Sequence, residues 1–170
     1  MNNLSDFRVE KNEFFASHPQ SPLTPEQKRE FTGLKYFPED ESLRLEVDVE
    51  EFPVAEPVEI QTSTDDVRLY QRFGCFRFMV EGQEASLTIY DTDFGFFLPF
   101  VDALANSETY GAGRYLEPEP LENGKYLVDF NLAYNPYCAY NDRYSCPLTP
   151  WENRISVSIR AGEKIFKPVT

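Results

Sequence analysis

The sequence predicts a mainly β protein: an antiparallel barrel or sandwich of roughly seven or eight strands with two short N-terminal helices. Three observations support this fold class. Apolar residues follow a period of two from Leu43 onward, whereas the helix-like segments lie before residue 37. The alternating segments are short and are joined mostly by turns. Aromatic residues make up 15% of the chain, with 15 Phe and 10 Tyr, and such side chains suit sheets better than helical bundles.

Two helices are expected near the start of the chain. Residues 3–16 contain no Gly or Pro, and the proline-containing segment 18–22 ends this helix, because a residue that precedes proline avoids helical geometry. One side of this helix is loosely apolar and carries Phe7, Lys11, Phe14 and Phe15. Thr24 is typical of a helix N-cap, and Gln27 completes a capping box. We expect this second helix to end at Gly33.

The β strands are expected wherever apolar and polar residues alternate, since one face of each strand is then buried. These segments are residues 43–50, 58–62, 67–73, 75–80, 85–89, 114–116, 125–131 and 155–159. A proline-bounded turn separates the first two, and Gly74 is expected to mark a kink or a bulge. Residues 91–106 are expected to form an aromatic-rich loop. Asn123 and Gly124 predict a type I′ hairpin between 114–116 and 125–131.

The chain is predicted to be a single domain over residues 1–170. A length of 170 residues is enough for one core, and a chain of this size buries about 68–70% of its extended surface. Residues 1–37 would form a helical cap, and residues 43–170 would form the β core with a long irregular loop at 132–154. We find no internal repeat, low-complexity segment or linker that would divide the chain.

Charge and hydropathy restrict the partners. The net charge is −13, which repels phosphate groups and therefore argues against nucleic acid and anionic lipid as partners. Residues 1–30 lack a basic start followed by an apolar run, and the most apolar window, 94–105, is too short to span a bilayer. Three Cys residues fit a reducing compartment. We therefore expect a cytoplasmic protein without nucleic-acid or membrane partners; the oligomeric state does not follow from the sequence.

The chemically most varied side chains lie between residues 109 and 164. Asp129 and Asn131 are two positions apart on a predicted strand, so both side chains project from one face, where they could line a pocket or cap a turn. Arg114 could hold an anionic group of a ligand. The structural alternative is an ion pair between Arg114 and Asp129 across the predicted hairpin.

Cys138 and Cys146 leave three alternatives open: two ordinary buried thiols, a disulfide across the loop, or a metal site. Two thiolates need further ligands, and the chain has a single histidine, His18. The same scarcity restricts nucleophilic catalysis, because Cys-His and Ser-His-Asp arrangements need a histidine base. Carboxylates remain as acid–base groups or as ligands of a divalent cation; the candidates are Asp129, Glu152 and Glu163.

Several motifs together resemble the bacterial and archaeal family called domain of unknown function 1684. They are Thr109-Tyr110-Gly111-Ala112-Gly113-Arg114-Tyr115-Leu116, Asp129-Phe130-Asn131, Ala133-Tyr134-Asn135-Pro136, Cys138-Ala139-Tyr140, Cys146-Pro147, Glu152-Asn153 and Ala161-Gly162-Glu163-Lys164. The early segments Ser21-Pro22-Leu23 and 31–37 extend the resemblance over nearly the whole chain, and Thr149-Pro150 is a mild departure from it. The resemblance implies a shared fold but carries no activity, cofactor or residue role.

We expect first a pocket for a small polar ligand in the C-terminal half, with carboxylate-based catalysis as its enzymatic form. Its candidate lining residues are Arg114, Asp129, Asn131, Asn135, Cys138, Glu152, Asn153 and Glu163. The alternative is a non-catalytic structural or interaction module in which these side chains only satisfy the backbone. A further alternative is a divalent-cation protein that uses Asp129, Glu152 and Glu163. Neither the cofactor nor the presence of enzymatic activity follows from the sequence.

Overall fold

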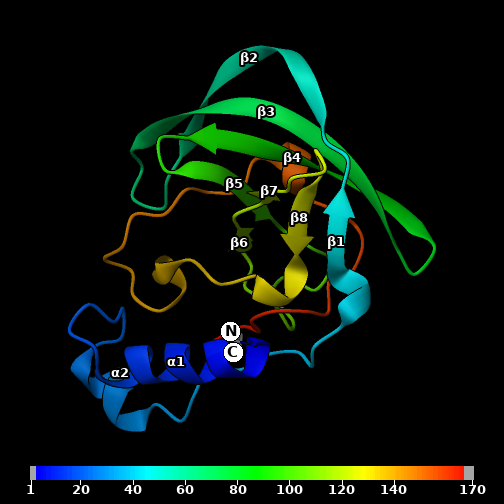
Figure 1. The fold of residues 1–170 in the computed structure, drawn as a ribbon. Coiled ribbons are helices and arrows are strands. Elements are labelled where there is room, and N and C mark those ends of the chain that lie inside the picture. The colour runs from blue at the N-terminus through cyan, green and yellow to red at the C-terminus, as the bar shows by residue number, and fades with distance from the viewer. Residues whose placement is uncertain (1–2, 167–170) are drawn as a thin grey trace.

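The computed structural model describes residues 3–166, which form two antiparallel sheets with two helices below them (Figure 1). The larger sheet has the order β2 (Glu50–Gln61), β3 (Val67–Val80), β4 (Gln83–Thr92), β5 (Gly95–Phe100) and β6 (Arg114–Leu116). The smaller sheet has the order β1 (Arg44–Val47), β8 (Tyr126–Asp129) and β7 (Glu119–Pro120). The arrangement is sandwich-like and does not close into a barrel. The predicted mainly β class is confirmed.

Helices α1 (Leu4–Ser17) and α2 (Pro25–Glu30) lie where the sequence predicts them. The capping box of Thr24 and Gln27 is present at the start of α2. This helix ends at Glu30, before Gly33, because the chain becomes extended at Phe31 and packs beside α1. Within residues 3–166, neither helix has the length and apolar character that crossing a bilayer requires.

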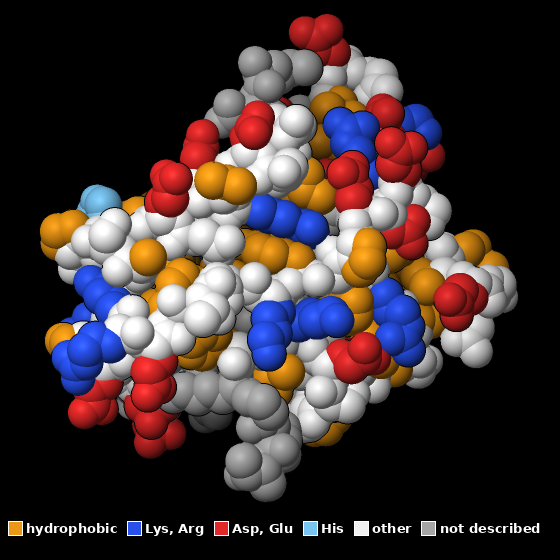
Figure 2. All heavy atoms as spheres, turned by 90° about the horizontal axis from the view of Figure 1, so that it is seen from below, with side chains coloured by type: hydrophobic (Ala, Val, Ile, Leu, Met, Phe, Trp, Pro, Cys, Tyr) orange, Lys and Arg blue, Asp and Glu red, His pale blue; other side chains and the backbone are white. Residues whose placement is uncertain are grey.

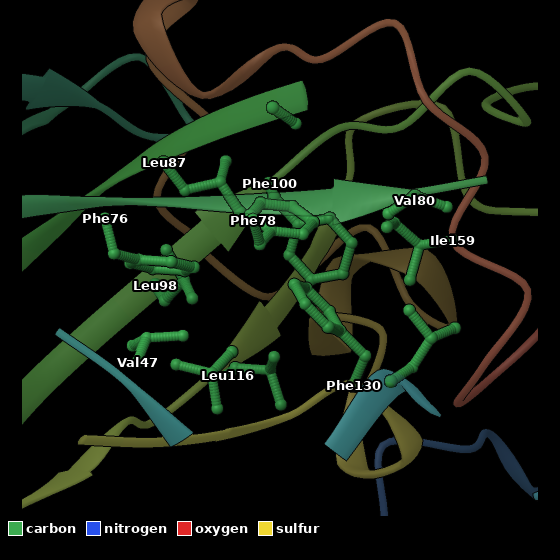
Figure 3. Close-up of a cluster of buried hydrophobic side chains, with 14 of the residues drawn as sticks. Val47, Phe76, Phe78, Val80, Leu87, Leu98, Phe100, Leu116, Phe130 and Ile159 are labelled. Carbon is green, nitrogen blue, oxygen red and sulfur yellow. The ribbon is translucent and has the colours of Figure 1, made fainter. Parts of the chain in front are cut away.

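The main core lies between the two sheets. Phe76, Phe78, Leu87, Leu98 and Phe100 come from β3, β4 and β5 and are buried. Figure 3 shows these side chains directed towards a second set that closes the core from the other side. That second set is Val47, Leu116, Phe130 and Ile159. Each such side chain contributes about 1.5–3 kcal/mol through its removal from water, so this cluster fixes how the sheets pack.

The larger sheet departs from the prediction at both ends. β2 is one long strand from Glu50, with an irregular register between Glu51 and Glu56, where a proline-bounded turn was expected. It lies at the edge of the sheet, where prolines are tolerated. Residues 91–106 are not one loop, because Gly95–Phe100 pairs with β4 and β6 as β5. The predicted irregularity at Gly74 is confirmed by a register shift between β3 and β4.

The C-terminal part also differs from the expected strand pairing. β8 pairs with β1 and β7, so the hairpin at Gly124 joins β7 to β8 and not β6 to β8. Residues 155–159 form no strand, and the chain bends at Ser156 and Val157. Val157 and Ile159 alternate into the core as predicted, yet Ile155 bonds to Val101 outside any ladder. Here a period of two reports which side chains are buried, and it does not report strand formation or which groups satisfy the hydrogen bonds of the backbone.

Candidate functional site

Arg114 lies inside the protein, with 1% of its surface exposed. Its guanidinium donates to the main-chain carbonyls of Ile159 (3.0 Å), Glu163 (3.1 Å) and Ala161. Its carboxylate partner is Asp102 at 3.7 Å, so the expected pair with Asp129 is wrong. Burial lowers the pKa of Arg114 to about 10. These contacts position Arg114 as an anchor of the C-terminal backbone.

Asn131 and Asp129 join the end of β8 to the segment before β1. The Asn131 amide accepts from the Asp40 N–H and donates to the Asp40 carbonyl, both at 2.9 Å. Asp129 accepts from the main-chain N–H of Asn131 at 3.0 Å and caps the 3-10 helix that follows β8. Arg44 lies 3.8 Å from the second carboxylate oxygen of Asp129. Both candidates therefore satisfy nearby backbone groups.

Asn153 and Glu152 are adjacent in sequence but have different surroundings. Asn153 is fully buried and bonds to the N–H and carbonyl of Thr88 and to the carbonyl of Pro99, each at 2.8 Å. Glu152 lies at the surface, where the Arg72 guanidinium binds both of its carboxylate oxygens and the Tyr90 hydroxyl donates to one of them. Burial raises the pKa of Glu152, but these hydrogen bonds outweigh it and leave the pKa below its ordinary value.

Glu163 is the centre of a buried polar cluster that packs against α1. One carboxylate oxygen is paired with Lys11, and the other accepts from the Tyr140 hydroxyl (2.7 Å) and the Asn135 N–H (3.1 Å). Gly162 makes the turn into this position with a φ of 79°, where a Cβ would lie 2.6 Å from the Ala133 carbonyl. The cluster therefore connects α1 to the C-terminal segment.

Not every polar atom of this cluster has a partner. The side-chain amide nitrogen of Asn135 donates to the Lys164 carbonyl at 3.0 Å, but its Oδ1 is buried without a hydrogen-bond partner within residues 3–166. The hydroxyl of Tyr36 is likewise unpartnered there, and burial raises its pKa, with the charge of Glu163 adding to the shift. Buried polar groups normally find partners, so this cluster has hydrogen-bonding capacity that the described residues do not use.

An open groove of about 740 Å³ runs beside α1. We call it the aromatic groove, and it is lined by Phe7, Glu10, Lys11, Phe14, Phe15, Arg68, Tyr115, Tyr134, Pro136, Tyr137, Tyr144, Ser145, Cys146 and Pro147. Figure 2 views the molecule from below, from the side on which the helices lie in Figure 1, and shows hydrophobic and basic side chains interspersed across this face. Glu163 meets this groove through Lys11, whose ammonium group also lies 5.1 Å from the ring centre of Tyr134.

The aromatic lining of this groove was not among the predicted site residues. The sequence does indicate one wall of the groove. Phe7, Lys11 and Phe14 follow a helical spacing and therefore share one face of α1, and Phe15 is next to Phe14 in the sequence. The other wall comes from β6 and from an irregular segment around residues 134–147. No short-range pattern relates these two parts of the chain, so the groove could not be assembled from the sequence.

Cys138 and Cys146 are free thiols that lie side by side. The main-chain N–H of Cys138 donates to the sulfur of Cys146 at 3.3 Å, and the Tyr110 hydroxyl lies 3.9 Å from the sulfur of Cys138. Cys146 lines the aromatic groove, whereas Cys138 lines a second hollow of about 380 Å³ with Tyr110. The sulfur of Cys146 therefore lies beside the main chain of Cys138, and the two residues line different hollows.

The three candidate metal carboxylates do not meet. Glu152 binds Arg72 on the larger sheet, Glu163 binds Lys11 of α1, and Asp129 caps a helix near β1. Between residues 3 and 166, no group of three or more His, Cys, Asp or Glu side chains could hold one metal ion. The divalent-cation site considered from Asp129, Glu152 and Glu163 is therefore not formed.

Comparison with known proteins identifies relatives without an assigned activity. The solution NMR structure of an uncharacterized protein of Haloarcula marismortui is 38% identical, with a TM-score of 0.70 and coverage of 95% of this chain and 91% of that chain. No significant match is found among curated proteins. A family model described as "Protein of unknown function (DUF1684)" matches residues 29–164, well over half of the chain. The chain therefore belongs to the DUF1684 family, as its motifs suggested.

Proposed function

We propose that this protein binds a small molecule with a flat apolar ring and an anionic group in the aromatic groove. The observation that carries this proposal is the lining, in which seven aromatic residues occur together with the cations Lys11 and Arg68 and one acidic residue, Glu10. The sequence led us to expect a small polar ligand, and this lining favours one with an apolar body and a polar end. A volume of about 740 Å³ lies within the range of about 300–1,000 Å³ that is usual for small-molecule sites.

The aromatic side chains are suited to a flat partner. Tyr137 and Tyr144 pack edge-to-face with ring centres 5.2 Å apart, and Phe15 packs edge-to-face against Tyr137 at 6.1 Å. Ring pairs that hold each other in this way keep their exposed faces and edges in fixed directions. A planar ligand would therefore contact side chains that are already ordered, so little binding free energy would be lost in fixing their conformations.

Arg68 supports the anionic end of the proposed ligand. One of its terminal nitrogens donates to the Ser145 carbonyl at 2.7 Å, which leaves its other donors available. No described carboxylate lies within 4.0 Å of this guanidinium, whereas Lys11 is neutralised by Glu163. A guanidinium fixed on one side and free on the other binds carboxylate or phosphate with direction as well as charge.

Glu163 takes a positioning role in this proposal. It is 1% exposed, so it meets the groove only through the ammonium group of Lys11. Asn135 and Cys138, the other candidates in this part of the molecule, lie behind the lining or open into the neighbouring hollow. Ligand binding without catalysis therefore requires fewer assumptions than a carboxylate base.

The alternative of a structural module has its own support. Arg114, Asn131 and Asn153 direct their polar atoms to main-chain groups, as that alternative requires. We assign these three residues to folding and the aromatic groove to binding. The two hypotheses then describe different residues of one protein.

The test compares two probes that share a ring. We expect 2-naphthoate to shift the backbone amide resonances of groove residues in ¹H–¹⁵N spectra, and 2-naphthylmethanol, which lacks the charge, to bind more weakly. Arg68→Gln should weaken 2-naphthoate about tenfold, the value of one charge-assisted hydrogen bond of about 1.4 kcal/mol, and leave 2-naphthylmethanol unchanged. Arg77→Gln is the matched control, since Arg77 lies on the same strand but away from the groove.

A second pair of variants tests the apolar part. Phe14→Ala should weaken both probes, because it removes a ring from the groove wall, whereas Phe94→Ala removes a fully exposed ring elsewhere and should affect neither. Equal affinity of the two probes would overturn the anionic group in the proposal. Resonance shifts that map outside the groove, or no binding of either probe at millimolar concentration, would overturn the site itself.

A further inference from the structure

We propose that Cys138 and Cys146 form a redox couple in which Cys138 reduces a small hydroperoxide and Cys146 converts the product into an intramolecular disulfide. The proposal concerns the hollow beside Cys138 and does not rest on a ligand in the aromatic groove. It is carried by the placement of the two sulfurs, by access to one of them, and by the groups around it.

A disulfide requires that the two sulfurs can meet. Cys146 accepts a hydrogen bond from the main-chain N–H of Cys138 at 3.3 Å, so its sulfur lies next to the backbone that carries the other thiol. The residues between them form a 3-10 helix and turns without a sheet ladder. A small rotation of either side chain can therefore bring the sulfurs to bonding distance, which disulfide geometry requires.

The two thiols differ in solvent exposure, and we use this difference to decide which of them reacts with the hydroperoxide and which then forms the disulfide. Cys138 is half-buried and lines a hollow of about 380 Å³ with Tyr110 and Asp142, while Cys146 is buried. A hydroperoxide can approach Cys138 through this hollow and then leave its oxygen on that sulfur. Cys146 does not line this hollow but borders the aromatic groove, and its sulfur, next to the main chain of Cys138, is placed to attack the product. Asp142 and the net charge of −13 disfavour an anionic disulfide as the oxidant.

The surroundings also favour the thiolate on Cys138. The Cys146 thiol lies within hydrogen-bond reach and lowers the pKa of Cys138 from 9.0 to about 6, against the opposing effect of burial and with help from the Tyr110 hydroxyl. The same interaction raises the pKa of Cys146. The pair thus shares one proton near neutral pH, with the negative charge on the more accessible sulfur. Thiolates, rather than thiols, attack peroxides.

The reaction balances without another reagent. The Cys138 thiolate attacks the terminal oxygen of ROOH, the O–O bond breaks, and the leaving alkoxide takes a proton to give ROH. Cys146 then attacks the sulfur of Cys138–SOH, an S–S bond forms, the S–O bond breaks, and hydroxide leaves as water with the proton of Cys146. In total, two thiols lose two electrons and two protons, and ROOH is reduced to ROH and water.

Alkylation measures the reactivity of Cys138 directly. At pH 6, a thiol of pKa about 6 has about 500 times the thiolate fraction of an unperturbed thiol of pKa 9.0, and its roughly 20-fold lower nucleophilicity leaves a net advantage of about 25-fold. We therefore expect iodoacetamide to modify Cys138 about 25-fold faster than the thiol of an unstructured cysteine peptide added to the same reaction, as measured by peptide mass spectrometry of the full chain. Equal rates at Cys138 and in the added peptide would overturn the assignment.

Oxidation with hydrogen peroxide tests the couple. One equivalent should give the Cys138–Cys146 disulfide in the wild type. In Cys146→Ser, Cys138 should stop at the sulfenic acid and be trapped by dimedone; in Cys138→Ser, Cys146 should remain reduced. Tyr110→Phe should slow the first step while leaving the fold intact. A disulfide that involves Cys75, or peroxide reactivity of Cys146 that survives Cys138→Ser, would overturn the proposal.

Discussion

The larger sheet and the C-terminal segment 130–166 satisfy their backbones in different ways. In the sheet, the main-chain groups of β3 and β4 pair with each other from Gln71 to Val80. In the C-terminal segment, side chains provide many of the partners: Arg114 binds three carbonyls, and Asp102 accepts from the N–H of Ile159 at 2.8 Å. An extended segment without strand neighbours depends on such buried polar side chains.

This difference explains why chemically distinctive residues gather in one part of the sequence. A sheet needs apolar side chains on its inner face, and its hydrogen bonds follow from strand pairing. An irregular segment of similar burial needs Arg, Asn and Asp at particular positions, because no ladder is available. Among the candidates, Arg114 has this role, because its three carbonyl partners lie in the C-terminal segment. Asn131 and Asn153 belong to that segment and attach it to main-chain groups elsewhere in the fold. The surface suited to a ligand is built mainly from aromatic residues.

The largest expected effect is that of removing Arg114. Arg114→Met should lower the free energy of unfolding by about 3–5 kcal/mol, because it leaves Asp102 as a buried charge without its partner. Three carbonyls of the C-terminal segment would also lose their donor. Urea denaturation of the two proteins measures the difference.

The double variant separates charge from packing. Arg114→Met combined with Asp102→Asn should recover part of the lost stability, since the unpaired charge is removed with the cation. Arg77→Gln, at an exposed position of β3, should change stability by less than about 0.5 kcal/mol. If Arg114→Met costs no more than Arg77→Gln, the C-terminal backbone does not depend on this side chain, and the contrast with the sheet fails.

A smaller loss is expected at Asn153. Asn153→Ala removes three hydrogen bonds of 2.8 Å that join this residue to β4 and β5, and should cost about 2–3 kcal/mol, because the freed groups stay buried. Asn123→Ala, in the exposed turn before β8, should cost less than about 1 kcal/mol. Similar unfolding curves for the two variants would mean that water replaces the Asn153 amide.

Most of the fold could be predicted because strands and helices have short-range signals. The capping box of Thr24 and Gln27 and the alternation in β3 depend only on near neighbours. β5 was not predicted, because Gly95 and Pro99 are typical of loops. Its pairing with β4 depends on a tight turn between the two strands. In segment 155–159, buried side chains alternate as predicted but no strand forms. The main-chain groups of Ile155 and Val157 bond to Val101 and Ala103, which lie far away in the sequence.

The site was harder to predict than the fold. Sequence reasoning located the unusual polar residues but could not separate those that hold the backbone from those near a hollow. Arg114 illustrates this limit, because its partner Asp102 lies in the segment that was expected to be an irregular loop. The groove combines α1 with residues around 134–147, and only tertiary packing relates two such distant segments.

The smallest expected effect depends on pH and concerns Glu152 on the larger sheet. Since the folded pKa of Glu152 lies below its ordinary value of 4.5, its ionised form adds stability above pH 4.5 that is lost as the pH falls through the folded pKa. Glu152→Gln should therefore cost about 1 kcal/mol at pH 7, and the cost should shrink in thermal melts towards and below pH 4. Glu84→Gln removes an exposed ion pair with Arg77 at 3.7 Å and should show no such trend. A cost for Glu152→Gln that stays constant down to low pH would mean that shape, rather than charge, holds this contact to Arg72.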